Sequence, residues 1–223
     1  MHCASHDGFS YLTDDCAFVY SINQGKSEPY PDFIKIVEKY LDMFPNKNRT
    51  YIDVGAHLGT TIMPYSRKYN KIVGYEVNQK TFEFLTRNIK INNLEDKVTI
   101  HNYGLYSFPC TGSVFQHNSC NSGCYYFKPD PNGVIKCTTL DEDYPDNDVD
   151  YIKIDTEGSE LHILQGANRI LTQSKPFVQI ECNNLSDKLF GISKTEIVNY
   201  MTNLGYSIFD DKTSESNIFF YHL

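Results

Sequence analysis

The stretch Thr50-Tyr51-Ile52-Asp53-Val54-Gly55-Ala56-His57-Leu58-Gly59 decides the fold, because a short apolar run passes directly into a glycine-containing turn. A buried parallel strand enters its crossover helix in this way. The glycines at positions 55 and 59 let the backbone approach a ligand closely. Ligands of open α/β sheets bind outside the carboxyl ends of the strands, so this turn is the first candidate site.

Similar units follow along the chain and predict an α/β fold. Strands are expected at residues 50–54, 71–76, 97–101, 149–155, 176–181, 206–209 and 218–221. Helices are expected over 79–92, 159–171 and 194–204. The last two strands should pair in antiparallel fashion across a polar turn. The pattern predicts a Rossmann-like seven-stranded sheet, mostly parallel with one antiparallel closing strand and with helices on both faces.

Two segments fall outside this repeat. In residues 1–48 only 32–44 has the spacing of an amphipathic helix, and residues 1–30 have no sustained periodicity. We interpret this segment as an N-terminal arm that is a candidate cap over an acceptor. Residues 107–137 hold several prolines and glycines among short β-prone pieces, which predicts an insertion of loops with a hairpin in one domain that spans 49–223.

Composition excludes several classes of protein. The net charge of −8 over 223 residues disfavours a nucleic-acid partner, which needs clustered Lys and Arg. No apolar run is long enough to span a membrane, and the N-terminus lacks the features of a secretion signal. Seven cysteines, an odd number, favour reduced thiols and a cytoplasmic location. The excess of Lys over Arg and the abundant Asn suggest an AT-rich genome, bacterial or viral, so the location would be a bacterial cell or a virus-infected host cell.

Two acidic residues lie at the ends of the first two predicted strands, Asp53 and, 23 residues later, Glu76. A carboxylate beside the turn repels a pyrophosphate, and the third glycine of a dinucleotide fingerprint is missing. S-adenosylmethionine carries sulfonium and ammonium charges, which suit Asp53. Glu76 stands where an acid accepts hydrogen bonds from ribose hydroxyls. Either acid alone is often only part of a tight turn or a solvated strand end, but together they predict a nucleoside site.

A second pair of acids, Asp155 and Glu181, ends two later strands. If those strands are neighbours, both carboxylates converge beside the nucleoside pocket. They could share a divalent cation such as Mg²⁺ or Mn²⁺, or one could act as a general base. The structural alternative is that Asp155 caps the next helix, while Glu157 and Glu160 favour its positive end.

These motifs together resemble the FkbM family of S-adenosylmethionine-dependent methyltransferases over about residues 50–183. The resemblance rests on Asp53–Gly59, Tyr75-Glu76-Val77-Asn78, Asn88-Ile89-Lys90-Ile91-Asn92, Thr139-Leu140-Asp141, Lys153–Glu160 and Leu164-Gln165-Gly166-Ala167. Val77 departs from the family's usual second motif, which has proline after the glutamate. The resemblance implies a class I methyltransferase fold, a methyltransferase domain at 49–223, and methylation of a sugar or polyketide-type hydroxyl.

The candidate residues form two groups. Cofactor binding is assigned to Asp53, Gly55, Ala56, His57, Gly59, Thr60, Glu76, Val77, Asn102, Asp155 and Glu157. Catalysis is assigned to Asp155, Glu181, Lys153 and His162, with Asp155 and Glu181 also as ligands of Mg²⁺ or Mn²⁺. The expected acceptor is a sugar or glycan, as a nucleotide-sugar or a glycoprotein glycan.

Other interpretations remain open from the sequence. They are an O-methyltransferase of a non-sugar alcohol or phenol, a nicotinamide-dependent oxidoreductase and a binding module without catalysis. His117, Cys120 and Cys124, with Cys110 and Cys137 nearby, could form a zinc site, although the spacing misses the tight Cys-x2-Cys knuckle. The sequence makes no prediction about oligomeric state.

Overall fold

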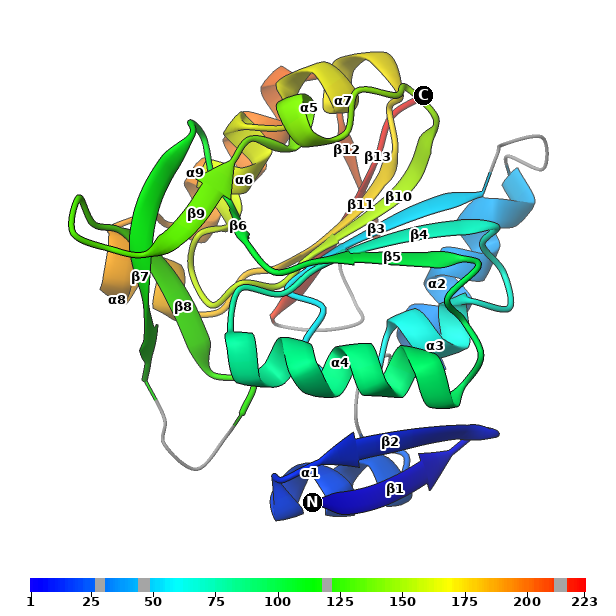
Figure 1. The fold of residues 1–223 in the computed structure, drawn as a ribbon. Coiled ribbons are helices and arrows are strands. Elements are labelled where there is room, and N and C mark those ends of the chain that lie inside the picture. Colours follow the sequence, from blue (N-terminus) through cyan, green and yellow to red (C-terminus); the bar gives the residue numbers. More distant parts are fainter. Residues whose placement is uncertain (27–30, 44–48, 118–121, 211–215) are drawn as a thin grey trace.

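The computed structural model describes residues 1–26, 31–43, 49–117, 122–210 and 216–223, and it centres on one large sheet (Figure 1). The strands of this sheet are β3 (Thr50–Val54), β4 (Lys71–Tyr75), β5 (Val98–His101), β10 (Val149–Ile154), β11 (Phe177–Glu181), β12 (Ser207–Asp210) and β13 (Asn217–Tyr221). Their order is β12-β13-β11-β10-β3-β4-β5. Strand β13 is antiparallel to both of its neighbours, whereas the run from β11 to β5 is parallel. The predicted mostly parallel α/β sheet is confirmed.

Helices cover both faces of the sheet. One face carries α2 (Pro31–Met43), α3 (Ile62–Tyr65) and α4 (Gln79–Ile91). The opposite face carries α5 (Leu140–Asp143), α6 (Glu160–Gln165), α7 (Asn168–Gln173) and α9 (Lys194–Asn203). All five side chains of β3 and all six of β10 are buried, as expected for parallel strands covered on both faces.

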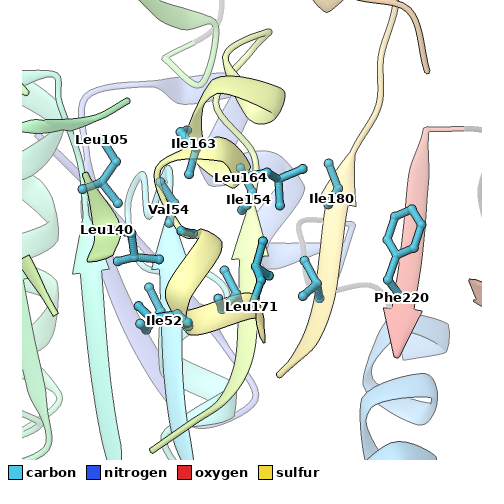
Figure 2. Packing of buried hydrophobic residues seen from close by; sticks show 14 of the residues in the cluster. Ile52, Val54, Leu105, Leu140, Ile154, Ile163, Leu164, Leu171, Ile180 and Phe220 are labelled. Atoms are coloured by element: carbon cyan, nitrogen blue, oxygen red, sulfur yellow. The ribbon is translucent and has the colours of Figure 1, made fainter. Parts of the chain in front are cut away.

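Alternate residues of each strand enter different cores. Ile52 and Val54 of β3 join Ile154 of β10 and the helices α6 and α7 in the core that Figure 2 shows. Tyr51 and Tyr151 point to the other face, where their rings stack at 4.8 Å between centroids. Burying aromatic and branched side chains on both faces fixes the register of the strands, because a one-residue slip would exchange the two faces.

The predicted helix over 159–171 is wrong as a single element. It is two short helices, α6 and α7, that meet at Gly166. A Cβ at this residue would lie 2.1 Å from the carbonyl oxygen of Tyr106, and the Gly166 carbonyl accepts the N–H of Asp141 at 2.9 Å. The carboxylate of Asp141 then caps α7, accepting the N–H groups of Arg169 and Ile170 at 2.7 and 3.0 Å. A contact with a distant segment therefore interrupts the helical pattern.

The N-terminal arm is also more regular than the sequence indicates. It contains a hairpin of β1 (His2–His6) and β2 (Phe9–Thr13), followed by α1 (Cys16–Asn23). Asn88 of α4 and Asn92, the residue that follows this helix, hold the hairpin. Asn88 exchanges two hydrogen bonds with the backbone of Leu12, and Asn92 exchanges two with Ser10. The arm is thereby fastened to the helix that covers the sheet (Figure 1).

The insertion forms a second sheet rather than loops with one hairpin. Its strands are β6 (Gly104–Leu105), β7 (Cys110–Gln116), β8 (Tyr125–Pro129) and β9 (Ile135–Thr138), in the order β6-β9-β7-β8. Tyr106, Phe127 and Cys137 form its small core. One further helix, α8 (Leu185–Phe190), follows β11. In the part of the chain that the structure describes, no helix is both long and apolar enough to cross a membrane.

Candidate active site

A cavity of about 480 Å³ opens at the carboxyl ends of β3, β4, β10 and β11. This volume lies in the usual range for pockets that bind small molecules. The strand-end loops form its floor. Two segments far away in the sequence supply the rest of its wall, the arm with Phe18 and the insertion with Tyr125 and Phe127.

The first loop of the pocket is packed directly against the loop after β10. Gly55 has a φ of +86°, and a Cβ there would lie 1.8 Å from the backbone oxygen of Asp155. The N–H groups of Gly55 and Ala56 both donate to the carbonyl of Tyr75 at 2.9 Å. The loops after β3, β4 and β10 are thus one connected backbone surface that only glycine permits at position 55.

Glu76 lies at the end of β4 and faces this pocket. It is 7% exposed and accepts the backbone N–H groups of His57 and Asn78 at 2.9 and 2.8 Å. Burial raises the pKa of this carboxyl to about 7. Val77, Tyr103 and Leu105 also line the pocket, so apolar side chains and a carboxylate border the same space. Such an arrangement suits the base and the ribose of a nucleoside.

Asp155 and Glu181 are brought together by the strand register. Ile154 pairs with Ile180, so the next residues of the two strands lie side by side. The two carboxyl groups are close enough for each to shift the other's pKa, and Asp155 Oδ2 accepts from Lys153 Nζ at 2.7 Å. Burial and the neighbouring Asp155 raise the pKa of Glu181 well above its usual value, whereas the Lys153 ammonium helps to lower the pKa of Asp155 despite its burial. At neutral pH Asp155 is therefore ionised and Glu181 holds a proton.

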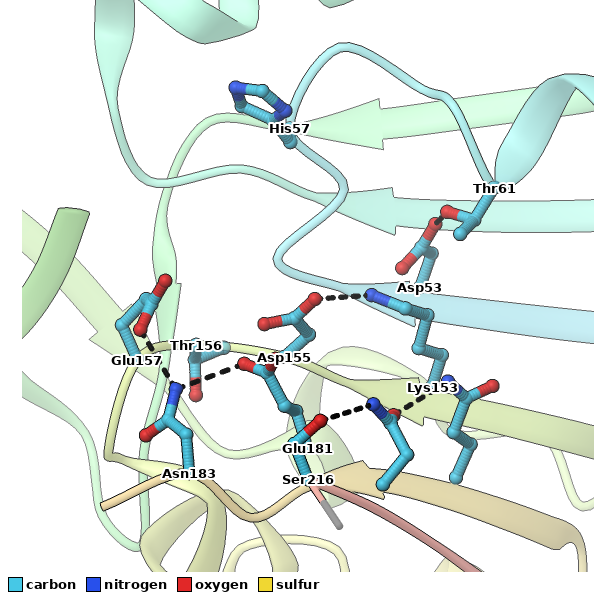
Figure 3. A network of polar contacts seen from close by, with 12 residues as sticks. Asp53, His57, Thr61, Lys153, Asp155, Thr156, Glu157, Glu181, Asn183 and Ser216 are labelled. Atoms are coloured by element: carbon cyan, nitrogen blue, oxygen red, sulfur yellow. Dashed lines mark hydrogen bonds and ion pairs between the residues drawn. The ribbon is translucent and has the colours of Figure 1, made fainter. Parts of the chain in front are cut away.

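Asn183 and Glu157 extend this cluster (Figure 3). Asn183 Nδ2 donates to Glu157 at 3.0 Å and to Glu181 at 3.1 Å. Burial raises the pKa of Glu157 to about 7. Glu160, in contrast, is a structural residue: its buried carboxylate accepts from Thr156, Gly158 and Ser186 and fixes the turn that carries Glu157.

Asp53 supports the site from below and does not line the pocket. It is fully buried, accepts a hydrogen bond from the Thr61 hydroxyl and pairs in register with Lys153 (Figure 3). Burial raises its pKa, and the Lys153 ammonium acts in the opposite direction. Asp53 thus helps to position Lys153.

Three other residues proposed from the sequence also stand outside the pocket lining. Gly59 turns the first loop, and Asn102 donates to the carbonyl of Glu76 at 2.8 Å. His162 stacks on Tyr106 with 4.3 Å between ring centroids. We assign His162 no part in the chemistry, because it packs against the insertion. The other proposed residues, Gly55, Ala56, His57, Thr60, Glu76, Val77, Lys153, Asp155, Glu157 and Glu181, all line the pocket.

The sequence did not predict a set of contacts among Asp15, Phe18, His57 and Ser122 that joins the arm to the insertion beside the pocket; we call these four residues the roof of the pocket. His57 Nε2 lies 3.0 Å from Ser122 Oγ, and the N–H of Ser122 donates to Asp15 at 3.0 Å. Phe18 packs edge-on against His57, with 4.6 Å between ring centroids. Burial lowers the pKa of His57 to about 4, so its imidazole is neutral in this roof.

The strand order with its reversed strand and the pocket at the strand ends define a class I methyltransferase. The family profile described as "Methyltransferase FkbM domain" matches residues 53–208. The chain therefore belongs to the FkbM family of S-adenosylmethionine-dependent methyltransferases. This membership leaves no support for a nicotinamide-dependent oxidoreductase.

Solved structures share the fold. A methyltransferase FkbM from Methylobacillus flagellatus KT has a TM-score of 0.57 at 20% identity, over 78% of this chain and 44% of that chain. A putative rRNA methylase from Clostridium thermocellum has a TM-score of 0.54 at 11% identity, over 84% and 92%. A SAM-dependent methyltransferase from Aquifex aeolicus has a TM-score of 0.50 at 13% identity, over 86% and 90%. The chain spans less than half the length of the Methylobacillus protein. No curated protein matches the sequence.

The residues present fit S-adenosylmethionine. The pocket is lined by five acidic residues, Asp15, Glu76, Asp155, Glu157 and Glu181, together with apolar side chains such as Val77 and Leu105. Acidic groups suit a ligand with two positive charges, and Glu76 can still accept hydrogen bonds from a ribose.

The raised pKa of Glu76 predicts that cofactor affinity depends on pH. If ribose hydroxyls donate to the carboxylate, the protonated form binds poorly, so the dissociation constant of S-adenosylhomocysteine should rise about tenfold from pH 8 to pH 6. Glu76→Gln should weaken binding at pH 8 by roughly ten- to a hundredfold and remove most of this dependence. Calorimetric titration measures both effects, with Glu83→Gln on the exposed side of α4 as the control. An unchanged affinity in Glu76→Gln would contradict the assignment.

Proposed function

We propose that this methyltransferase methylates oxygen, at a hydroxyl of a sugar or glycan. The observation that carries the proposal is the Asp155 carboxylate, which is half-buried beside Lys153 and Glu181 and faces the cavity. A sugar hydroxyl is a very weak acid, so its attack on a methyl group needs a base at the oxygen. Nitrogen acceptors that are neutral at physiological pH need no such base.

Each charged residue has a separate task in this proposal. Bound S-adenosylmethionine supplies an electrophilic methyl group. Asp155 accepts a hydrogen bond from the acceptor hydroxyl and takes its proton as the carbon–oxygen bond forms. Lys153 donates a hydrogen bond to Asp155, which orients the carboxylate and keeps it ionised. Positioning the hydroxyl in line with the methyl group supplies much of the remaining rate.

The Mg²⁺ or Mn²⁺ site at Asp155 and Glu181 is the weaker alternative for these residues. Burial and the neighbouring Asp155 raise the pKa of Glu181, so this carboxyl favours its protonated form, and Lys153 donates to Asp155. A divalent ion would have to displace the proton and the ammonium contact together. We therefore assign the pair to proton transfer.

Aromatic side chains support a sugar or glycan as the acceptor. Phe18 from the arm and Tyr125 and Phe127 from the insertion line the same pocket as the carboxylates. Aromatic faces together with polar groups suit a sugar ring, which has apolar C–H faces and hydroxyl edges. A nucleotide-sugar or a glycoprotein glycan would present such a ring, and the arm with the insertion would form the acceptor cap.

The test is methyl transfer to a panel of acceptors. Free sugars, nucleotide-sugars and glycoprotein glycans form one arm, and phenols and non-sugar alcohols form the other. Release of S-adenosylhomocysteine is measured together with the mass of the product. Turnover with a sugar-containing acceptor supports the proposal, and turnover confined to the second arm would replace it with a non-sugar O-methyltransferase.

A further inference from the structure

Three side chains that can ligate metals meet at the edge of the pocket. His117 follows β7, Cys124 precedes β8, and Glu157 lies in the turn between β10 and α6. Their ligand atoms all lie within 4.8 Å of one another, and His117 Nε2 is 3.4 Å from Glu157 Oε2. Cys120, which the sequence spacing grouped with the first two, lies outside the described residues.

The backbone holds all three groups in place. The N–H of His117 donates to the carbonyl of Cys124 at 3.1 Å, which closes the end of the β7–β8 hairpin. Glu157 has a φ of +57°, an uncommon conformation that the Glu160 network maintains, and Asn183 donates to its carboxylate at 3.0 Å. A ligand set that is ordered in advance loses little conformational entropy when an ion binds.

We propose that His117, Cys124 and Glu157 bind a transition-metal ion, with Zn²⁺ as the expected one. A thiolate, an imidazole and a carboxylate are ligands that Zn²⁺ takes together, whereas Mg²⁺ prefers oxygen alone. Three protein ligands leave a fourth position open, and Glu157 places that position at the pocket. Asn183 orients the carboxylate from behind, as outer partners of metal ligands do.

Charge supports a cation at this place. Asn183 bridges the carboxyl groups of Glu157 and Glu181, and Asp155 lies beside Glu181, so three acidic groups gather at this edge of the pocket. A dication bound by one thiolate and one carboxylate is a neutral unit, so it would relieve the repulsion between Glu157 and Asp155. The ion would also tie the insertion to the turn that follows Asp155. The site does not depend on the identity of the acceptor.

The test uses Co²⁺ as a spectroscopic probe on the full chain after removal of bound metal. Wild-type protein should bind one equivalent and show both a thiolate-to-cobalt charge-transfer band and the visible bands of a tetrahedral site. Zn²⁺ should displace the Co²⁺, and an excess of Mg²⁺ should not. Cys124→Ser and His117→Ala should each weaken Co²⁺ binding about a hundredfold or more, measured by competition with a chromophoric chelator.

Two variants control for unspecific thiol binding. Cys137→Ser removes a thiol of the insertion that is as buried as Cys124, at 6% exposed, and should keep the band. Cys16→Ser breaks an exposed pair in which the Cys16 thiol lies 3.2 Å from His2, and it should also keep the band. Circular dichroism checks folding, and Glu157→Gln provides a third ligand variant if Cys124→Ser is unstable. Absence of the band, its persistence in both Cys124→Ser and His117→Ala, or its loss only in Cys16→Ser would overturn the proposal.

Discussion

Asp155→Asn should lower kcat by about 10²–10⁴, the range expected when a general base is lost. The amide keeps the size of the side chain but cannot take the proton of the acceptor hydroxyl. Affinity for S-adenosylhomocysteine should change much less than kcat, because several other groups hold the cofactor. Single-turnover measurements with saturating cofactor separate the chemical step from binding.

The dependence of activity on pH tests the role of Asp155 independently. The pKa of Asp155 is lowered, so activity that depends on its carboxylate should persist into the acidic range and fall only as that carboxylate is protonated. Lys153→Met removes the ammonium that keeps Asp155 ionised, so the acidic limb should move to higher pH. Asp96→Asn, on an exposed turn, is the matched control and should leave kcat unchanged. Full activity in Asp155→Asn would exclude this residue as the base.

Gly55→Ala should destabilise the protein by about 3 kcal/mol or more and abolish cofactor binding. The new Cβ would lie 1.8 Å from the backbone oxygen of Asp155, at a φ of +86° that an L residue rarely adopts. Relief of this overlap must separate the loops after β3 and β10, which displaces Asp155. Urea unfolding and titration with S-adenosylhomocysteine measure the two losses.

Gly191→Ala is the matched control for this substitution. Gly191 has a φ of +67°, but a Cβ there would meet no atom within 4 Å. Because only conformational strain is added, Gly191→Ala should lower the free energy of unfolding by about 1–2 kcal/mol and leave cofactor affinity unchanged. Equal losses in the two variants would show that backbone strain, and not the contact with Asp155, limits position 55.

The central sheet could be predicted because its signals are local. Strands β3 and β10 are buried on both faces, so they are rich in aromatic and branched apolar residues, and glycine or acidic residues follow them. The β1–β2 hairpin was missed because its strands are five residues each, and Asn88 and Asn92 hold it from more than 70 residues away. The break at Gly166 likewise depends on a contact with Tyr106, which no helical periodicity records.

The candidate site shows the same contrast between local sequence signals, which could be predicted, and contacts between distant segments, which could not. Asp155 and Glu181 could be placed together because acids at the ends of neighbouring parallel strands must meet at one edge. The contact between Asp15 and Ser122 in the roof could not be predicted, because these residues are 107 positions apart and neither belongs to a motif. The sequence could not distinguish pocket residues from those behind it, since Asp53 ends in a buried position through the tilt of its side chain toward Thr61.

The central claim is that the chain transfers a methyl group to oxygen with Asp155 as the base. The most direct measurement is nuclear magnetic resonance of the product formed from ¹³C-methyl S-adenosylmethionine and a sugar-containing acceptor, by wild-type protein and by Asp155→Asn. We predict a labelled methyl ether on the sugar from wild-type protein and at least a hundredfold slower formation by the variant. A label on nitrogen or carbon, or the same ether formed equally fast by Asp155→Asn, would contradict the account.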